Sequence, residues 1–145
     1  MFNSFEYFDS IKAAVPEIEK VYKASGLSAL EEVLTDLRNN PNCCLVARDS
    51  GDGFLNLKTT KLDNAYHTIY VMVQVKLNDH DSRLAAKRAA MTTGLKVFMR
   101  MKQDANDFGD PAYGLNDSRI DYNEIGPLGS NYYGYAFGFS IDNYL

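Results

Sequence analysis

Side chains that could bind a metal ion are few, and their spacing favours structural roles. Asp79, His80 and Asp81 are consecutive, but neighbours on a helix point in different directions and only residues three or four apart share a face. Such a run is typical of a helix N-terminus, where acidic side chains cap backbone amides and complement the helix dipole. We therefore expect this run to begin a helix and to bind no metal.

The two cysteines, Cys43 and Cys44, are adjacent. On a strand they would point to opposite faces, with one thiol in the core and the other directed outward. This spacing fits neither a disulfide framework nor a zinc site of the C-x-x-C kind. We expect reduced thiols in an intracellular protein.

The sequence also contains no recognisable arrangement of residues for acid–base or nucleophilic catalysis. His67 lies within a strand pattern, far in sequence from any nucleophile, and no G-x-S-x-G motif is present. Asp121 and Glu124 are three apart on an expected strand and would point to opposite faces. The C-terminal glycines do not form a G-x-G-x-x-G motif. We expect no enzymatic activity and no cofactor.

The segment 49–53 is rich in Asp and Gly and partly resembles a calcium-binding loop. Position twelve of such a loop would be Thr60, where a bidentate Glu is required. The same residues are strong turn formers. We expect a hairpin turn that joins a strand beginning at Cys43 to a second strand over 54–59.

The first 42 residues predict a helical lead-in. Apolar side chains recur at steps of three and four from Phe5 to Tyr22, which is typical of amphipathic helices. Ser28 and Glu31 form a capping box for a further helix, which Pro41 and the two preceding asparagines end.

After residue 42 the apolar period changes to two, which predicts strands. Further strands are expected over 65–76, 119–125 and 133–141, the last alternating bulky with tiny residues. Between them, residues 79–104 predict a long helix with a buried stripe of Leu84, Met91, Leu95, Phe98 and Met99. We expect this stripe to face Val71, Val73, Tyr135 or Phe137.

These elements predict one α+β domain over residues 1–145, in which 1–42 form the helical lead-in and 43–145 the sheet and long helix. We expect a mainly antiparallel sheet of about five strands, with the long helix packed across one face.

Composition restricts the class of protein. The chain has 145 residues, of which 46% are hydrophobic and 23% charged, values typical of a globular domain. Its net charge of −4 gives no basis for non-specific nucleic-acid binding. No apolar run approaches the ~20 residues of a membrane span. The N-terminus lacks a signal-peptide pattern.

Charge is unevenly distributed along the chain. Residues 79–103 contain six basic side chains and two acidic ones, whereas residues 104–145 contain seven acidic ones and Arg119 alone. The two blocks could neutralise each other within one chain, or they could meet between subunits in a head-to-tail contact. For the second alternative the candidate interface residues are Arg83, Lys87, Arg100, Asp107, Phe108, Asp110 and Tyr132.

The order of elements and three sequence segments resemble small bacteriophage tail-completion or tail-terminator proteins over residues 27–145. The segments are 66–73, Ile125-Gly126-Pro127-Leu128, and 133–137, which reads Tyr-Gly-Tyr-Ala-Phe. The resemblance implies a non-enzymatic subunit that forms an oligomeric ring, commonly six-fold, at the tail end or neck. It also implies other tail or neck proteins as partners, and location in the virion after assembly in the host cytoplasm.

Two other classes of function stay open. One is a small adaptor that binds a protein partner through the loop 105–118, which is rich in Gly and Asp. The other is a small-molecule enzyme, which would need a polar pocket built from His67, Asp121 or tyrosine side chains.

Overall fold

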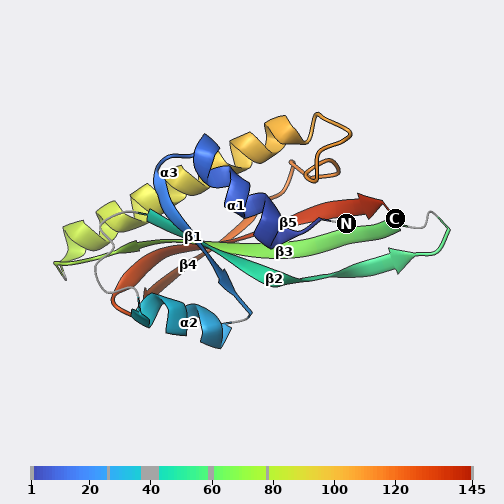
Figure 1. Cartoon of the computed structure of the whole chain (residues 1–145). Coiled ribbons are helices and arrows are strands. Elements are labelled where there is room, and N and C mark those ends of the chain that lie inside the picture. The colour runs from blue at the N-terminus through green and yellow to red at the C-terminus, as the bar shows by residue number, and fades with distance from the viewer. Residues whose placement is uncertain (1, 26, 37–42, 59–60, 78, 145) are drawn as a thin grey trace.

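A five-stranded sheet organises the chain (Figure 1). The computed structural model describes residues 2–25, 27–36, 43–58, 61–77 and 79–144. The strands are β1 (Ile18–Ala24), β2 (Cys43–Asn56), β3 (Lys61–Gln74), β4 (Asp121–Leu128) and β5 (Tyr132–Tyr144). Their order is β1-β2-β3-β5-β4, and only the β1–β2 pairing is parallel. The predicted α+β class with a mainly antiparallel sheet is confirmed.

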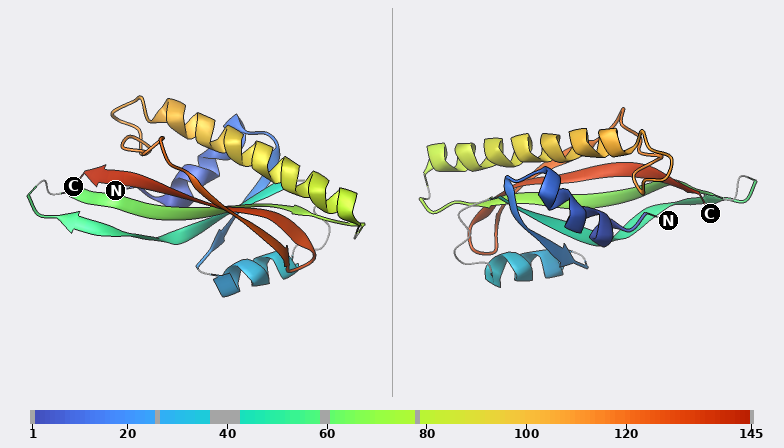
Figure 2. Two further views of the ribbon diagram at one scale, coloured as in Figure 1. Left: turned by 180° about the vertical axis from the view of Figure 1, so that it is seen from behind. Right: turned by 45° about the horizontal axis from the view of Figure 1, so that its top comes forward.

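Helices cover both faces of this sheet. The helices are α1 (Ser4–Ala14), α2 (Leu27–Asp36) and α3 (His80–Asp104). Figures 1 and 2 show α1 and α3 on one face and α2 on the other. Helix α3 connects β3 to β4, which flank β5 and run parallel to each other, so α3 must cross the sheet.

Hydrophobic clusters form on both faces of the sheet. Phe8, Val97 and Phe139 belong to the core between the sheet and the pair α1 and α3. Leu34 and Met72 belong to the core beneath α2. Alternate residues of β5 therefore contribute to different cores.

Helix α3 begins as the sequence predicts. Asp79 is its N-cap, and the side chain accepts a hydrogen bond of 2.7 Å from the backbone N–H of Ser82. That bond lowers the pKa of Asp79, because it stabilises the ionised carboxylate. The capping role predicted for residues 79–81 is confirmed.

The prediction of an entirely helical lead-in is wrong. Residues 18–24 form strand β1, which pairs in parallel with β2. The spacing of Ile18, Val21 and Tyr22 suits a helix, yet all three residues are β-branched or aromatic and suit a strand equally well. The strand is favoured over the helix, because the backbone of residues 18–24 can pair with the backbone groups at the edge of β2. Residues 37–42, where the second predicted helix ends, lie outside the described part of the chain.

The predicted hairpin turn at 49–53 is also wrong. Strand β2 continues through this segment, with Gly51 opposite His67 and Asp52 opposite Tyr66. The register shifts on either side of these two pairs, so the turn-forming residues make irregularities in a long strand. The connection to β3 instead follows Asn56.

The predicted buried stripe of α3 is largely wrong. Phe98 is buried and Met91 is half-buried, but Leu84, Leu95 and Met99 are 36%, 61% and 53% exposed. The face turned to the sheet carries mostly smaller side chains: Ala86, Ala90, Thr93, Gly94, Val97, Phe98 and Met101.

The aromatic rings of β5 explain why the small side chains of α3, and not most of the large ones, face the sheet. A Cβ atom at Gly94 would lie 2.5 Å from the ring of Phe137, well inside contact distance. The bulky residues of β5 already fill the space between helix and sheet, so the helix can approach only with its narrow face.

Candidate assembly surface

The outer side of α3 carries an apolar stripe that this chain leaves uncovered. Leu84, Leu95 and Met99 are separated by eleven and four residues, which places them on one side of the helix. The half-buried Met91 lies between them. We call Leu84, Met91, Leu95 and Met99 the α3 stripe.

A hollow lies beside the C-terminal half of this stripe, and we call it the α3 groove. It has a volume of about 380 Å³. Its apolar lining is Ala14 at the end of α1, Val15 and Pro16 in the connection to β1, and Leu95 and Met99 of α3. The remaining lining residues are polar or charged: Glu17, Lys96, Arg100 and Gln103. Lys96 forms an ion pair with Glu17, and Arg100 pairs with Asp104, so the groove combines apolar side chains with cations that are already paired within the chain.

The basic residues proposed for an interface already interact within the chain. Lys87 forms an ion pair with Glu124 of β4, and Arg100 contacts Asp104 at 3.1 Å. Arg83 also has an interaction partner within the chain. The Lys87–Glu124 pair joins the two charge blocks inside one subunit, as the first of the two alternatives predicts.

The loop after α3 holds the acidic candidates and Phe108 on the surface. Asp107 accepts a hydrogen bond of 3.0 Å from the N–H of Gly109, and Asp110 accepts one of 2.8 Å from the N–H of Ala112. Neither carboxylate has an ion-pair partner among the described residues. Phe108 is 80% exposed, and its ring packs edge-on against Tyr113 at 4.9 Å. The loop thus presents an aromatic ring between two carboxylates.

Tyr132 does not belong to any surface of this subunit. It lies on the face opposite the large rings of β5, as the alternation predicts, but it is fully buried in the core beneath α2. Burial raises the pKa of its hydroxyl. The expectation that Tyr132 is exposed is wrong. The sequence pattern does not indicate that α2 covers this face of the sheet.

The turn between β4 and β5 holds α2 in this position. The N–H of Ser130 donates to the carbonyl of Leu34 at 3.0 Å, and its hydroxyl donates to the carbonyl of Thr35 at 2.8 Å. These bonds satisfy carbonyls near the end of the helix. Gly129 has a φ of +53°, and a Cβ there would lie 2.4 Å from the Leu34 carbonyl carbon.

A second hollow, of about 310 Å³, lies between α1 and the end of α3. Inside it the hydroxyl of Tyr7 donates to Asp104 at 2.7 Å, and Asp104 also contacts Arg100. Burial, the hydrogen bond to Asp104 and the charges of Asp104 and Asp110 raise the pKa of Tyr7 above its ordinary value. Tyr7 is therefore a fixed hydrogen-bond donor that ties α1 to α3.

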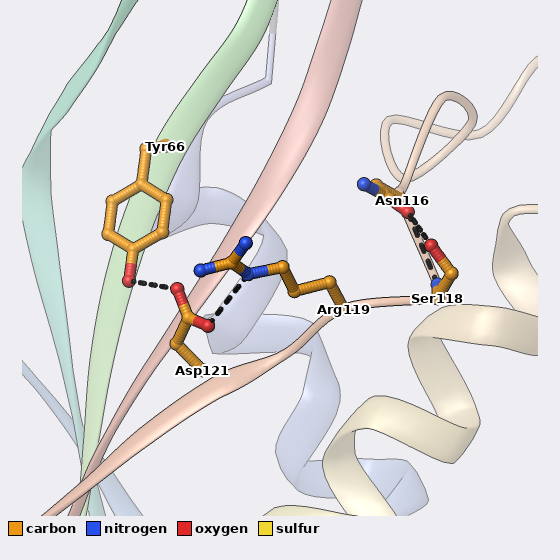
Figure 3. A network of polar contacts seen from close by, with 5 residues as sticks. All are labelled: Tyr66, Asn116, Ser118, Arg119 and Asp121. Carbon is orange, nitrogen blue, oxygen red and sulfur yellow. Dashed lines mark hydrogen bonds and ion pairs between the residues drawn. The ribbon is translucent and has the colours of Figure 1, made fainter.

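Of the residues considered for a polar enzyme pocket, Asp121 and one tyrosine are in contact, whereas His67 lies apart from them. Figure 3 shows Tyr66 of β3 donating to Asp121, at 3.2 Å, while Arg119 donates to the other carboxylate oxygen at 3.0 Å. The ring of Tyr66 reaches Asp121 across Gly138, where any Cβ would overlap the hydroxyl. His67 points to the opposite face of the sheet.

His67 is buried between aromatic rings. Its imidazole lies 5.0 Å from the ring of Phe2 and is stacked on Phe139 at 5.6 Å. Within the described part of the chain neither ring nitrogen has a hydrogen-bond partner. Burial lowers the pKa of His67, since no group compensates the desolvation of the charged form.

The two cysteines are free thiols on opposite faces of the sheet. Cys43 lies in the core under α3, and Cys44 lies in the core beneath α2. The expectation that one thiol would point outward is wrong, because helices cover both faces here. Burial raises the pKa of Cys43 to about 11 and that of Cys44 to about 12, so both stay protonated at neutral pH.

Among the described residues, no three or more His, Cys, Asp or Glu side chains are grouped to hold a metal ion. No helix in the described ranges is both long and apolar enough to cross a membrane. Comparison of the chain with protein-family models, curated proteins and solved structures gives no match.

Proposed function

We propose that the chain is a non-enzymatic structural subunit whose copies associate through the outer side of α3. The assembly we propose is an oligomeric ring at the tail end or neck of a bacteriophage virion or tail-like particle. Other tail or neck proteins are its further partners. It enters the virion after assembly in the host cytoplasm, and it binds neither nucleic acid nor membrane.

The α3 stripe is the observation that carries this proposal. Large apolar side chains that are grouped and exposed on one side of a helix are typical of interaction sites, because exposing them to water is unfavourable. Leu95 and Met99, both more than half exposed, also line a groove. The sequence resemblance to tail-terminator proteins over residues 27–145 supports the virion as the setting.

The second candidate is an adaptor that uses the loop 105–118 to bind a different protein. The exposed ring of Phe108 favours it, since aromatic side chains are enriched at the centres of protein interfaces. The adaptor differs from the ring subunit in one measurable respect, because it would be a monomer in the absence of its partner.

Light scattering coupled to size exclusion tests the proposal. A ring gives a defined multiple of the 16.3 kDa chain mass that persists on dilution to micromolar concentration. A particle of 16.3 kDa under all conditions would overturn the ring and favour the adaptor.

A further inference from the structure

We propose that residues 2–4 form a cover over His67 that opens when the imidazole takes up a proton at acidic pH. The inference concerns one subunit and does not depend on self-assembly. His67 is 8% exposed, and the ring of Phe2, which is itself 6% exposed and precedes α1, lies 5.0 Å from the imidazole. The strand partner of His67 on β2 is Gly51, which has no side chain to pack over it. Phe2 is therefore the ring from outside the sheet that covers the imidazole.

The closed arrangement leaves buried polar groups without hydrogen bonds both in the cover and beneath it. Within the described part of the chain, neither nitrogen of His67 has a partner, and the hydroxyl of Ser4 has none either. Ser4 is 5% exposed and begins α1, two residues after Phe2. A buried polar group without a hydrogen bond destabilises the folded state, because it has lost its bonds to water. Detaching residues 2–4 lets water reach both groups, which favours opening at this end of α1.

The described side chains packed around His67 supply no charge that would stabilise an imidazolium. Strand β5 contributes the ring of Phe139, against which Phe98 of α3 packs. On α1, the ring of Tyr7 lies 5.5 Å from that of Phe2, but its hydroxyl donates to Asp104. The other acids of these segments are Glu6, which lines the hollow beside Asp104, and Asp49 and Asp52 of β2, whose side chains lie outside the described part of the chain.

Proton binding and opening are therefore coupled in one direction. Burial lowers the pKa of His67 in the closed form, whereas a histidine exposed to water titrates near pH 6.5. The open form binds the proton more readily, so the closed form is favoured above that pH. Below it, each pH unit raises the ratio of open to closed molecules by up to about tenfold, until the closed form is itself protonated.

Fluorine NMR tests the opening directly. 4-Fluorophenylalanine is placed at position 2 in one sample and at position 8 in a second, which is the matched control because Phe8 is buried in the same cluster. A soluble nitroxide broadens the signal of a fluorine that reaches solvent. As the pH falls from 7.5 to 5.0, we expect this broadening to increase several-fold at position 2 and to stay constant at position 8. No increase at position 2, or an equal increase at both positions, overturns the inference.

Removing the titrating group tests the trigger. His67→Phe keeps an aromatic ring beneath Phe2 but binds no proton. In this variant we expect the fluorine at position 2 to show the same broadening at pH 7.5 and at pH 5.0. An increase that persists without His67 would show that another group opens the cover, which contradicts the proposal.

An NMR titration of the imidazole tests the cover without fluorine and without replacing His67. In Phe2→Ala we expect the pKa of His67 to rise toward its ordinary value, because water reaches the ring. Phe5→Ala is the matched control and should leave this pKa unchanged, since the half-buried ring of Phe5 lies 5.4 Å from the ammonium of Lys23 instead. The same pKa for His67 in Phe2→Ala and in the natural chain would mean that Phe2 is not its cover.

Discussion

His67 is a titratable residue that the fold removes from water. Its ring lies between Phe2 and Phe139 with both nitrogens buried, and this burial lowers its pKa. The folded state therefore binds the proton less readily than the unfolded chain, whose histidine titrates near pH 6.5. Stability that is fully present above that pH is lost as the pH falls through it.

This linkage predicts a pH dependence that one substitution removes. We expect the free energy of unfolding in urea to fall between pH 7.5 and pH 5.5 by a larger amount in the natural chain than in His67→Phe. Phenylalanine retains the ring between its aromatic neighbours but does not titrate. Identical pH profiles for the natural chain and His67→Phe would contradict the assigned role of burial.

The ion pair between Lys87 and Glu124 gives a second prediction at this scale. The side chains are 27% and 53% exposed, so the pair should contribute only ~0.2–1 kcal/mol. We expect Lys87→Glu to destabilise the monomer by an amount of that order, and Glu124→Lys in the same chain to restore it. Urea unfolding of the two single variants and the double variant measures the coupling. Additive effects would mean that the two charges do not interact.

The close approach of α3 to β5 is the most constrained feature at the scale of elements. Gly94 allows it, because a Cβ there would lie 2.5 Å from the ring of Phe137. In an exposed helix Ala is favoured over Gly by up to ~1 kcal/mol. Here we expect the opposite sign, with Gly94→Ala losing ~1–3 kcal/mol of stability from overpacking.

A double-mutant cycle distinguishes this clash from a general effect on the helix. Phe137→Leu creates space beside residue 94, so Gly94→Ala should cost less in that background than in the natural chain. Denaturant unfolding supplies all four stabilities. An equal cost in both backgrounds would show that the ring of Phe137 does not set the distance between helix and sheet.

The elements that the sequence predicts well are those with local signals. Asp79 marks the start of α3, and the two-residue period marks β3 and β5. Strand β1 could not be predicted in the same way, because its apolar spacing fits a helix and its partner β2 is distant in sequence. The buried face of α3 was missed for a similar reason, since the rings it meets belong to β5.

For the candidate surface too, local signals predict some features, and packing between distant segments determines the others. Asp107 and Phe108 are exposed and Asp110 is half-buried, all three in a loop whose surface location composition alone indicates. Tyr132 was expected at an interface but is covered by α2, which is hydrogen-bonded to Ser130. The α3 stripe was recognised as apolar, and only the packing of the whole domain reveals that it faces outward.

At the scale of the whole molecule, the fold leaves an apolar surface exposed to solvent. Helices protect both faces of the sheet, yet the outer side of α3 presents Leu95 and Met99 to solvent. The central claim is therefore that copies of this chain associate through α3.

Sedimentation equilibrium of three proteins tests that claim most directly. Leu95→Asp places a charge in the α3 groove, and Leu77→Asp places the same charge at a leucine of similar exposure outside it, 69% against 61%. We predict that the natural chain and Leu77→Asp sediment as the same multiple of 16.3 kDa, whereas Leu95→Asp sediments as a folded monomer. A natural chain that is itself monomeric, or a Leu95→Asp protein that associates as strongly as Leu77→Asp, would contradict the account.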